Sequence, residues 1–329
     1  MSEKIIVASG KGGAGKSSLC AGLALSLASK GESVLVIDFD IGQSCIDFIL
    51  GAQTSPVYNW GDALSGRCST GEILNSEGSV YYISAPKRWE DSFTAEKIKK
   101  TVAAFERNFS YILFDSPAGL TGGFLLAAEC ADSGIIVSTP DEVCVRAAAN
   151  AADELFEHGI DNVRLVINRF DRRPTEKGRF LNIDEVIDSV KVRLIGVVPE
   201  DKNITYCSSA GFRSLDECPA KAAYARIAGR LSGRDIPLVL SNSKKEKPKS
   251  KKPLAAVLIS LAVIVAVLGA AFFTDFYMAQ SLKEPVFCVQ RDNGSYRGFC
   301  YEYTVEKDGG KIISTNMKVL NKTVSAAIE

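Results

Sequence analysis

The sequence predicts an α/β domain with a mostly parallel sheet and helices on both faces, one transmembrane helix, and a small β-rich C-terminal module. Three observations support this prediction. Short apolar runs alternate with helical segments through residues 1–240, an order that produces parallel strands joined by right-handed crossovers. An uncharged run then covers residues 254–273. Beyond it, residues 275–329 contain strand-like runs separated by glycine-containing turns.

The composition narrows the class of protein. The chain has 329 residues, of which 46% are hydrophobic, and its formal net charge is zero. This length allows about two domains. Residues 244–252 hold six lysines and one glutamate, so residues 1–243 carry an acidic balance, which argues against nucleic acid as a partner. The nine cysteines form no C-x-x-C, and a zinc ribbon or standard cluster-carrier motif is therefore not supported.

A glycine-rich segment at residues 10–18 lies between an apolar run and a helical segment. It fits the P-loop pattern G-x-x-x-x-G-K-[ST], in which backbone N–H groups and a helix N-terminus surround phosphate oxygens. In such a loop Lys16 reaches the β- and γ-phosphates, and the Ser17 hydroxyl ligates Mg²⁺. The predicted nucleotide contacts here are Gly12, Gly13, Ala14, Gly15, Lys16, Ser17 and Ser18.

Acidic residues follow two of the apolar strands. Asp38 and Asp40 come directly after the run at 33–37, and Asp115 ends the run at 111–115. Open α/β sheets bind ligands at the carboxyl ends of their strands. The spacing of two gives Asp38 and Asp40 different orientations, which predicts different roles. An aspartate at the end of an apolar strand fits the Walker B position, which holds Mg²⁺ through water.

The remaining elements of the first domain follow from apolar runs, helical periodicity and turn residues. Residues 51–79 are predicted to be loop-rich. The further predicted strands cover residues 80–84, 134–138, 164–167 and 193–198. The predicted helices cover residues 18–30, 46–50, 94–108, 120–131, 143–157 and 220–231.

A second lysine, Lys11, completes the pattern KGGxGK[ST]. With it, the chain resembles the deviant Walker A ATPases of the MinD/ParA family, MinD most of all. The resemblance runs from about residue 3 to residue 240 and includes five motifs in the expected order. Among them, residues 116–119 look like the MinD version of the Walker B continuation. The fold it implies is that of a P-loop NTPase.

The resemblance also implies roles for single residues. ATP and Mg²⁺ would lie between two subunits of a homodimer, with Lys11 reaching the partner's nucleotide. Asp40 would position or activate the attacking water, while Asp38 would organise the magnesium shell and the P-loop. The implied catalytic residues are Lys11, Lys16 and Asp40. The implied metal-binding residues are Ser17, Asp38 and Asp115.

Two strand ends are predicted to flank the adenine base, as the corresponding turns do in MinD. Asn offers paired donor and acceptor groups that suit a purine edge, and Arg can stack on the ring. An ordinary strand-end loop is the alternative for Glu200 and Asp201. The residues concerned are Asn168, Arg169, Pro199, Glu200 and Asp201.

The uncharged run at residues 254–273 predicts a membrane span. Twelve of its twenty residues are Leu, Ile, Val or Phe, and a helix of this length covers roughly 30 Å, one hydrocarbon core. The lysine-rich linker at 241–253 precedes it. By the positive-inside rule, we expect a single-pass protein of the cell membrane with its ATPase domain cytoplasmic and residues 275–329 outside.

Residues 275–329 are predicted to form a small β module with strands at 286–290, 298–305, 311–318 and 323–328. So few residues bury little core, and a disulfide often stabilises modules of this size. Cys288 and Cys300 are candidates for such a bond, and two free thiols are the alternative.

These observations favour a membrane-anchored ATPase that works as a dimerisation switch and recruits or positions another protein, in cell division or envelope organisation. Turnover is expected to be slow without an activating partner. One alternative is a nucleotide-gated receptor or scaffold whose outer module senses a ligand. A P-loop tyrosine kinase is a further alternative, but the linker contains no tyrosine cluster.

Overall fold

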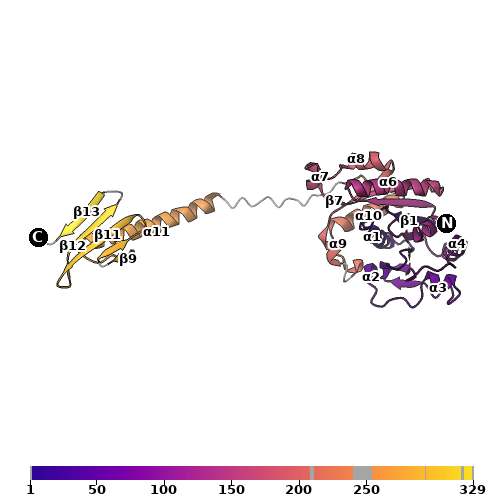
Figure 1. The fold of residues 1–329 in the computed structure, drawn as a ribbon, viewed down its shortest axis with the longest axis horizontal. Helices are drawn as coiled ribbons and strands as arrows, with labels where there is room; N and C mark the ends of the chain where they lie inside the picture. The colour runs from indigo at the N-terminus through magenta and orange to yellow at the C-terminus, as the bar shows by residue number, and fades with distance from the viewer. Residues whose placement is uncertain (1, 208–210, 240–253, 293, 320–321, 328–329) are drawn as a thin grey trace. The chain divides into compact units, whose positions relative to one another are not determined.

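A computed structural model describes residues 2–207, 211–239, 254–292, 294–319 and 322–327. These residues form two compact units, Met1–Ser243 and Lys244–Glu329 (Figure 1). The predicted linker at 241–253, with its lysines, lies outside the described residues.

The first unit contains an eight-stranded sheet in the order β3-β4-β2-β5-β1-β6-β7-β8. Every neighbouring pair is parallel except β3 with β4, which confirms the predicted mostly parallel α/β class. The strands are β1 (Glu3–Ala8), β2 (Val34–Asp38), β3 (Asn75–Glu77), β4 (Val80–Ile83), β5 (Tyr111–Asp115), β6 (Ser133–Ser138), β7 (Val163–Phe170) and β8 (Arg193–Pro199).

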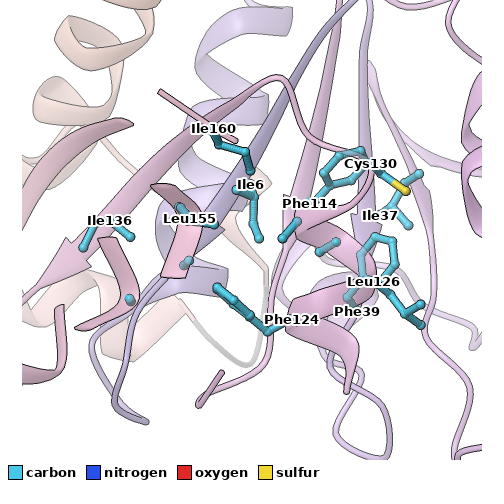
Figure 2. Packing of buried hydrophobic residues seen from close by; sticks show 14 of the residues in the cluster. Ile6, Ile37, Phe39, Phe114, Phe124, Leu126, Cys130, Ile136, Leu155 and Ile160 are labelled. Carbon is cyan, nitrogen blue, oxygen red and sulfur yellow. The ribbon is translucent and has the colours of Figure 1, made fainter. Parts of the chain in front are cut away.

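Helices pack against both faces of this sheet. Alternate residues of β1 belong to two buried clusters. Ile6 lies in a cluster that includes residues of α3, α4, α5, α6 and α8, and Ile5 lies in one that includes residues of α1, α2 and α10. Figure 2 shows part of the first cluster, including Ile6, Phe114 and Leu155. The helices are α1 (Lys16–Ala28), α2 (Ile46–Leu50), α3 (Trp60–Leu64), α4 (Ala95–Ala103), α5 (Gly123–Ala128), α6 (Glu142–Glu157), α7 (Arg172–Glu176), α8 (Ile183–Val190), α9 (Lys202–Tyr206) and α10 (Pro219–Leu231).

Some of these elements were not predicted. Helix α3 and strand β3 lie in the stretch 51–79, which was expected to be loop-rich, and helices α7, α8 and α9 were not predicted either. Helices α3 and α8 each begin with a capping box, built on Asn59 with Asp62 and on Asn182 with Glu185. This reciprocal pairing satisfies exposed backbone donors at a helix start, and it is the local signal that marks these helices.

The second unit consists of helix α11 (Leu254–Gln280) and a five-stranded antiparallel sheet in the order β13-β12-β11-β10-β9. Helix α11 continues beyond Phe273, the predicted end of the span, and residues Ser260–Gln280 form a candidate membrane span with a mean hydropathy of 2.0. Cys288 and Cys300 are free thiols. The strands are β9 (Val289–Asp292), β10 (Ser295–Arg297), β11 (Tyr301–Asp308), β12 (Lys311–Val319) and β13 (Lys322–Ala327).

Trp60 connects the unpredicted helix α3 to the end of β2. It is fully buried, and its Nε1 donates to the Asp38 carbonyl oxygen at 2.8 Å. We expect Trp60→Phe to lower the free energy of unfolding of residues 1–243 by about 1–3 kcal/mol, because a buried carbonyl loses its donor. Trp89→Phe makes the same substitution at a side chain that is 47% exposed, with an expected change within about 0.5 kcal/mol. Urea unfolding followed by circular dichroism measures both, and equal losses would contradict this role of Trp60.

Candidate nucleotide-binding site

The phosphate loop lies between β1 and α1, and two of its glycines are required by their surroundings. A Cβ on Gly10 would lie 2.0 Å from the Ala147 carbonyl oxygen of α6. Gly15 has a φ of 91° and leaves room for Asn168, whose Nδ2 would lie 2.2 Å from an added Cβ. Asn168 Nδ2 donates to the Ala14 carbonyl at 2.8 Å. The loop therefore keeps its shape through contacts with α6 and β7.

Lys16, the first residue of α1, lies beneath this loop. It is 7% exposed, and its Nζ donates to Ser9 Oγ at 3.0 Å, while Ser9 donates to the Lys11 carbonyl at 2.8 Å. Burial lowers the pKa of Lys16, and the charges of Asp115 and Asp40 oppose that shift. Ser9 thus positions Lys16, whose binding of phosphates stays a prediction. Sequence reasoning did not single it out, because it lies just outside the P-loop pattern.

Asp38, at the end of β2, is fully buried and its carboxylate is well supplied with donors. Oδ1 accepts from the Asp40 N–H at 2.8 Å, and Oδ2 accepts from Ser44 Oγ at 2.9 Å and Cys45 N–H at 3.0 Å, with Ile46 N–H more distant at 3.3 Å. Desolvation nevertheless raises the pKa of Asp38 to about 6. These bonds make Asp38 the organiser of the loop at 40–46. Its predicted part in the magnesium shell stays a prediction.

Asp115 differs from Asp38, although the two are register partners on β5 and β2. It is fully buried, and neither of its carboxylate oxygens has a hydrogen-bond partner among the described residues. Burial, together with the charge of Asp38, raises the pKa of Asp115 well above the ordinary range, and the nearby Ser17 hydroxyl and Lys16 oppose this. An unpaired buried carboxylate is costly unless a cation or donor joins it.

The surroundings of Asp115 therefore fit Mg²⁺. Donor atoms of Asp115, Asp38 and Cys45 lie within 4.8 Å of one another, and a carboxylate is a ligand that Mg²⁺ prefers. Cys45 was not predicted to be part of the site. Burial, with the charges of both aspartates, raises the pKa of its thiol to about 12, so it is present as a neutral thiol.

Lys11 and Asp40, two of the predicted catalytic residues, are both more exposed than Lys16. Lys11 Nζ is 3.6 Å from Asp141 Oδ1, and both side chains are partly exposed. Asp141 also caps α6 by accepting from the Cys144 N–H at 3.0 Å. Asp40 is half-buried, which raises its pKa, and the charge of Lys16 opposes this shift. Asp40 is thus less solvated than a surface carboxylate.

The predicted adenine-flanking residues divide into separate roles. Arg169 Nε pairs with Glu200 Oε2 at 2.8 Å, bringing the two strand ends together. Asp201 caps α9 by accepting from the Asn203 N–H at 3.0 Å, and Pro199 is the register partner of Phe170. A hollow of about 370 Å³ is lined by Pro199, Phe170 and neighbours from α7 and α8, and it shares no lining residue with the phosphate loop. Contact with adenine stays a prediction for all five residues.

A glycine-rich loop between a parallel strand and a helix, a buried lysine beneath it and paired aspartates at the ends of β2 and β5 define a P-loop NTPase. The ParA family model described as NUBPL iron-transfer P-loop NTPase matches residues 1–232. The chain belongs to the ParA/MinD family of P-loop NTPases.

Individual relatives are MinD proteins. MinD of Bacillus subtilis (strain 168) is 33% identical over 254 residues, which cover 74% of this chain and 95% of that protein. A chain of the MinC:MinD cell division protein complex of Aquifex aeolicus has a TM-score of 0.67 at 34% identity, covering 72% of this chain and 98% of that one. MinD of Pyrococcus horikoshii OT3, complexed with Mg-ADP, shares the fold with a TM-score of 0.64 at 24% identity, covering 70% of this chain and 96% of that one.

The two buried aspartates predict opposite effects of the same substitution in the nucleotide-free protein. Asp115→Asn removes a buried carboxylate that lies beside the charge of Asp38 and has only the Ser17 hydroxyl and Lys16 to oppose its burial among the described residues. It is expected to raise the free energy of unfolding by about 1 kcal/mol or more. Asp38→Asn removes an acceptor from a satisfied network and is expected to lower it by about 1–3 kcal/mol. Urea unfolding of residues 1–243 without Mg²⁺ measures both, and destabilisation by Asp115→Asn would contradict the unpaired carboxylate.

The raised pKa values also predict a pH dependence with a definite sign. A folded state that holds protons more tightly than the unfolded chain loses stability as pH rises above the unfolded pKa. We therefore expect the nucleotide-free fragment to lose stability between about pH 4 and pH 6, the interval set by Asp38. Asp115→Asn should flatten any further loss above that interval. A stability that rises throughout this range would contradict the burial of these carboxyl groups.

Proposed function

We propose that this protein is a membrane-anchored, ATP-hydrolysing dimerisation switch. The observation that carries the proposal is Asp115, a fully buried carboxylate without hydrogen-bond partners among the described residues, beside a P-loop. A Mg²⁺–ATP complex supplies the charge that this carboxylate lacks. The MinD of Pyrococcus horikoshii OT3, which is complexed with Mg-ADP, supports the same ligand class.

The chain's own residues divide the work of binding and hydrolysis. The loop amides and Lys16 would bind the phosphates, while Ser17 and Asp115 would hold Mg²⁺, which would neutralise developing phosphate charge. Asp40, whose pKa responds to the charge of Lys16, would position or activate the attacking water. The Arg169–Glu200 pair holds the two loops that face the base.

Lys11 links nucleotide binding to dimerisation. In one subunit its ammonium pairs with Asp141 at 3.6 Å, and its side chain is 47% exposed. Exposed pairs of this kind contribute about 0–1 kcal/mol, so little free energy opposes their exchange. We propose that Lys11 leaves Asp141 and binds the phosphates held by the partner subunit, which makes the dimer dependent on ATP.

The output of the switch is recruitment of a partner protein to the membrane. The relatives named as septum site-determining proteins, and the structure pairing MinD with MinC, support a role in the placement of cell division. Slow turnover keeps the dimer assembled until a partner accelerates hydrolysis, as in other switch NTPases.

Helix α11 is proposed to cross the membrane, with the ATPase unit in the cytoplasm and residues 275–329 outside. Only 6% of the apolar window that marks the candidate span Ser260–Gln280 is buried within the protein. The turns that precede the buried Asp275 therefore present an apolar surface that is stable in hydrocarbon. Insertion of a spanning helix is effectively irreversible. ATP would therefore change the dimer state of molecules that stay in the membrane.

Asp40→Ala tests the switch. We expect ATP turnover to fall by about 100-fold or more, because the group that positions water is lost, while ATP binding persists. Residues 1–243 carrying this change should sediment as a dimer with ATP and as a monomer with ADP. Adding Lys11→Ala should restore the monomer in ATP. A monomer in every state with ATP bound would favour the receptor alternative.

The anchor is tested by alkaline extraction of membranes that contain the full chain. The protein should stay in the pellet with and without ATP, since a spanning helix does not detach. A variant ending at residue 243 provides the soluble control, and ATP-dependent release would contradict the permanent anchor.

The orientation is tested in intact cells with Asp308→Cys and a maleimide that cannot cross membranes. Asp308 is an exposed residue of the β module, so we expect labelling above that of the wild-type protein. Protection of the cysteine at position 308 would contradict the orientation.

A further inference from the structure

Asp275 joins helix α11 to the β module that follows it. Its side chain is fully buried although it lies within an apolar helix. The carboxylate accepts from the Val286 N–H at 2.7 Å, the Phe287 N–H at 3.1 Å and the Tyr301 hydroxyl at 2.8 Å, and it contacts the Cys288 thiol at 3.0 Å. The module therefore holds a fixed position along the last turns of α11.

A second set of contacts gives the direction of the sheet along this helix. The Tyr301 ring, at the start of β11, lies 5.3 Å from the ring of Phe272. Farther along the sheet, Thr315 is the register partner of Val305, and its hydroxyl donates to the Ala279 carbonyl. Strand β11 thus begins beside residue 272 and runs toward the C-terminal end of α11. Its first residues lie beside the predicted end of the span.

The edge of the module at this level is apolar and exposed. The hairpin between β10 and β11 turns at Phe299, where Gly298 N–H donates to the Tyr301 carbonyl at 2.9 Å. Phe299 is 81% exposed, and Val286 and Phe287, which bond to Asp275, are each 57% exposed. At the opposite end of the sheet, the turn between β11 and β12 is charged and polar. It contains Glu306, Lys307, Asp308, Gly309, Gly310 and Lys311.

Two cations accompany this apolar edge. Arg297 on β10 and Lys318 on β12 are the register partners of Glu302 on β11, one on each side of it. Together with Phe299 they line a hollow of about 420 Å³. Apolar side chains such as Phe at the boundary of headgroups and acyl chains, with Lys or Arg beside them, are typical of protein segments that lie on a bilayer surface.

We infer that the module rests on the outer surface of the bilayer, with Val286, Phe287 and Phe299 inserted at the headgroup level and Arg297 and Lys318 contacting lipid phosphates. This inference rests on the proposed membrane span. The lipid surface is the partner because the apolar edge continues the exposed apolar surface of α11, where Phe273 is 69% exposed. The charged turn then faces the external solvent.

The membrane contact of the module is tested with the full chain in phosphatidylcholine–phosphatidylglycerol vesicles. The vesicles contain brominated acyl chains, which quench the fluorescence of nearby tryptophan. Three variants are compared: Phe273→Trp in the span, Phe299→Trp at the edge and Asp308→Trp at the far turn. The emission of wild-type protein, from Trp60 and Trp89, is subtracted. We expect about twofold or stronger quenching at positions 273 and 299, as for side chains at membrane depth, and none at 308.

The outcomes separate the membrane contact of the module from the span itself. Quenching at 273 without quenching at 299 overturns the membrane contact of the module and leaves the span intact. Absence of quenching at 273 overturns the span, and with it the membrane contact of the module. Equal quenching at 299 and 308 overturns the orientation of the module. In the Phe299→Trp background, Arg297→Gln with Lys318→Gln should weaken the quenching, and an unchanged value overturns the phosphate contacts.

Discussion

The structure of the ATPase unit depends on the burial of two carboxylates side by side. Asp38 and Asp115 are register partners on adjacent parallel strands, and both are inaccessible to solvent. Buried charge requires donors or a cation. The loop after β2 folds back to supply donors to Asp38, and Trp60 holds the carbonyl of the same residue. Asp115 receives no such supply among the described residues, which leaves it suited to a metal.

The same requirement shapes the second unit. Asp275 is an acid in an otherwise apolar helix, and the backbone of the following segment and the Tyr301 hydroxyl satisfy it. A lipid environment provides no such donors. The helix can therefore end in protein contacts while its preceding turns stay exposed. These bonds connect the five-stranded sheet to the end of the proposed span, and the sheet has an apolar edge and a charged one.

Local patterns predicted much of the fold and of the site. The buried strands β2 and β5 are continuous apolar runs, and the P-loop pattern specifies its own turn. The secondary structure of residues 51–79 was harder to predict, because Gly, Ser, Asn and Pro break the periodicity there. Helix α3 is short, and it is stabilised by the Asn59 capping box and by the burial of Trp60. A capping box with Asp62 in place of Glu or Gln is a weak signal by itself.

The sequence by itself determined the order of the buried parallel strands, the phosphate loop, the apolar helix and the acids at the strand ends, because periodicity and motif spacing are local properties. Only the tertiary structure decided which partners these groups have. Asn168 reaches Ala14 across 154 residues, Lys11 pairs with Asp141, and Asp38 and Asp115 differ in their donors although both end apolar strands. Hydrogen bonds and burial depend on which distant segments the fold brings together, and residue spacing carries no record of that.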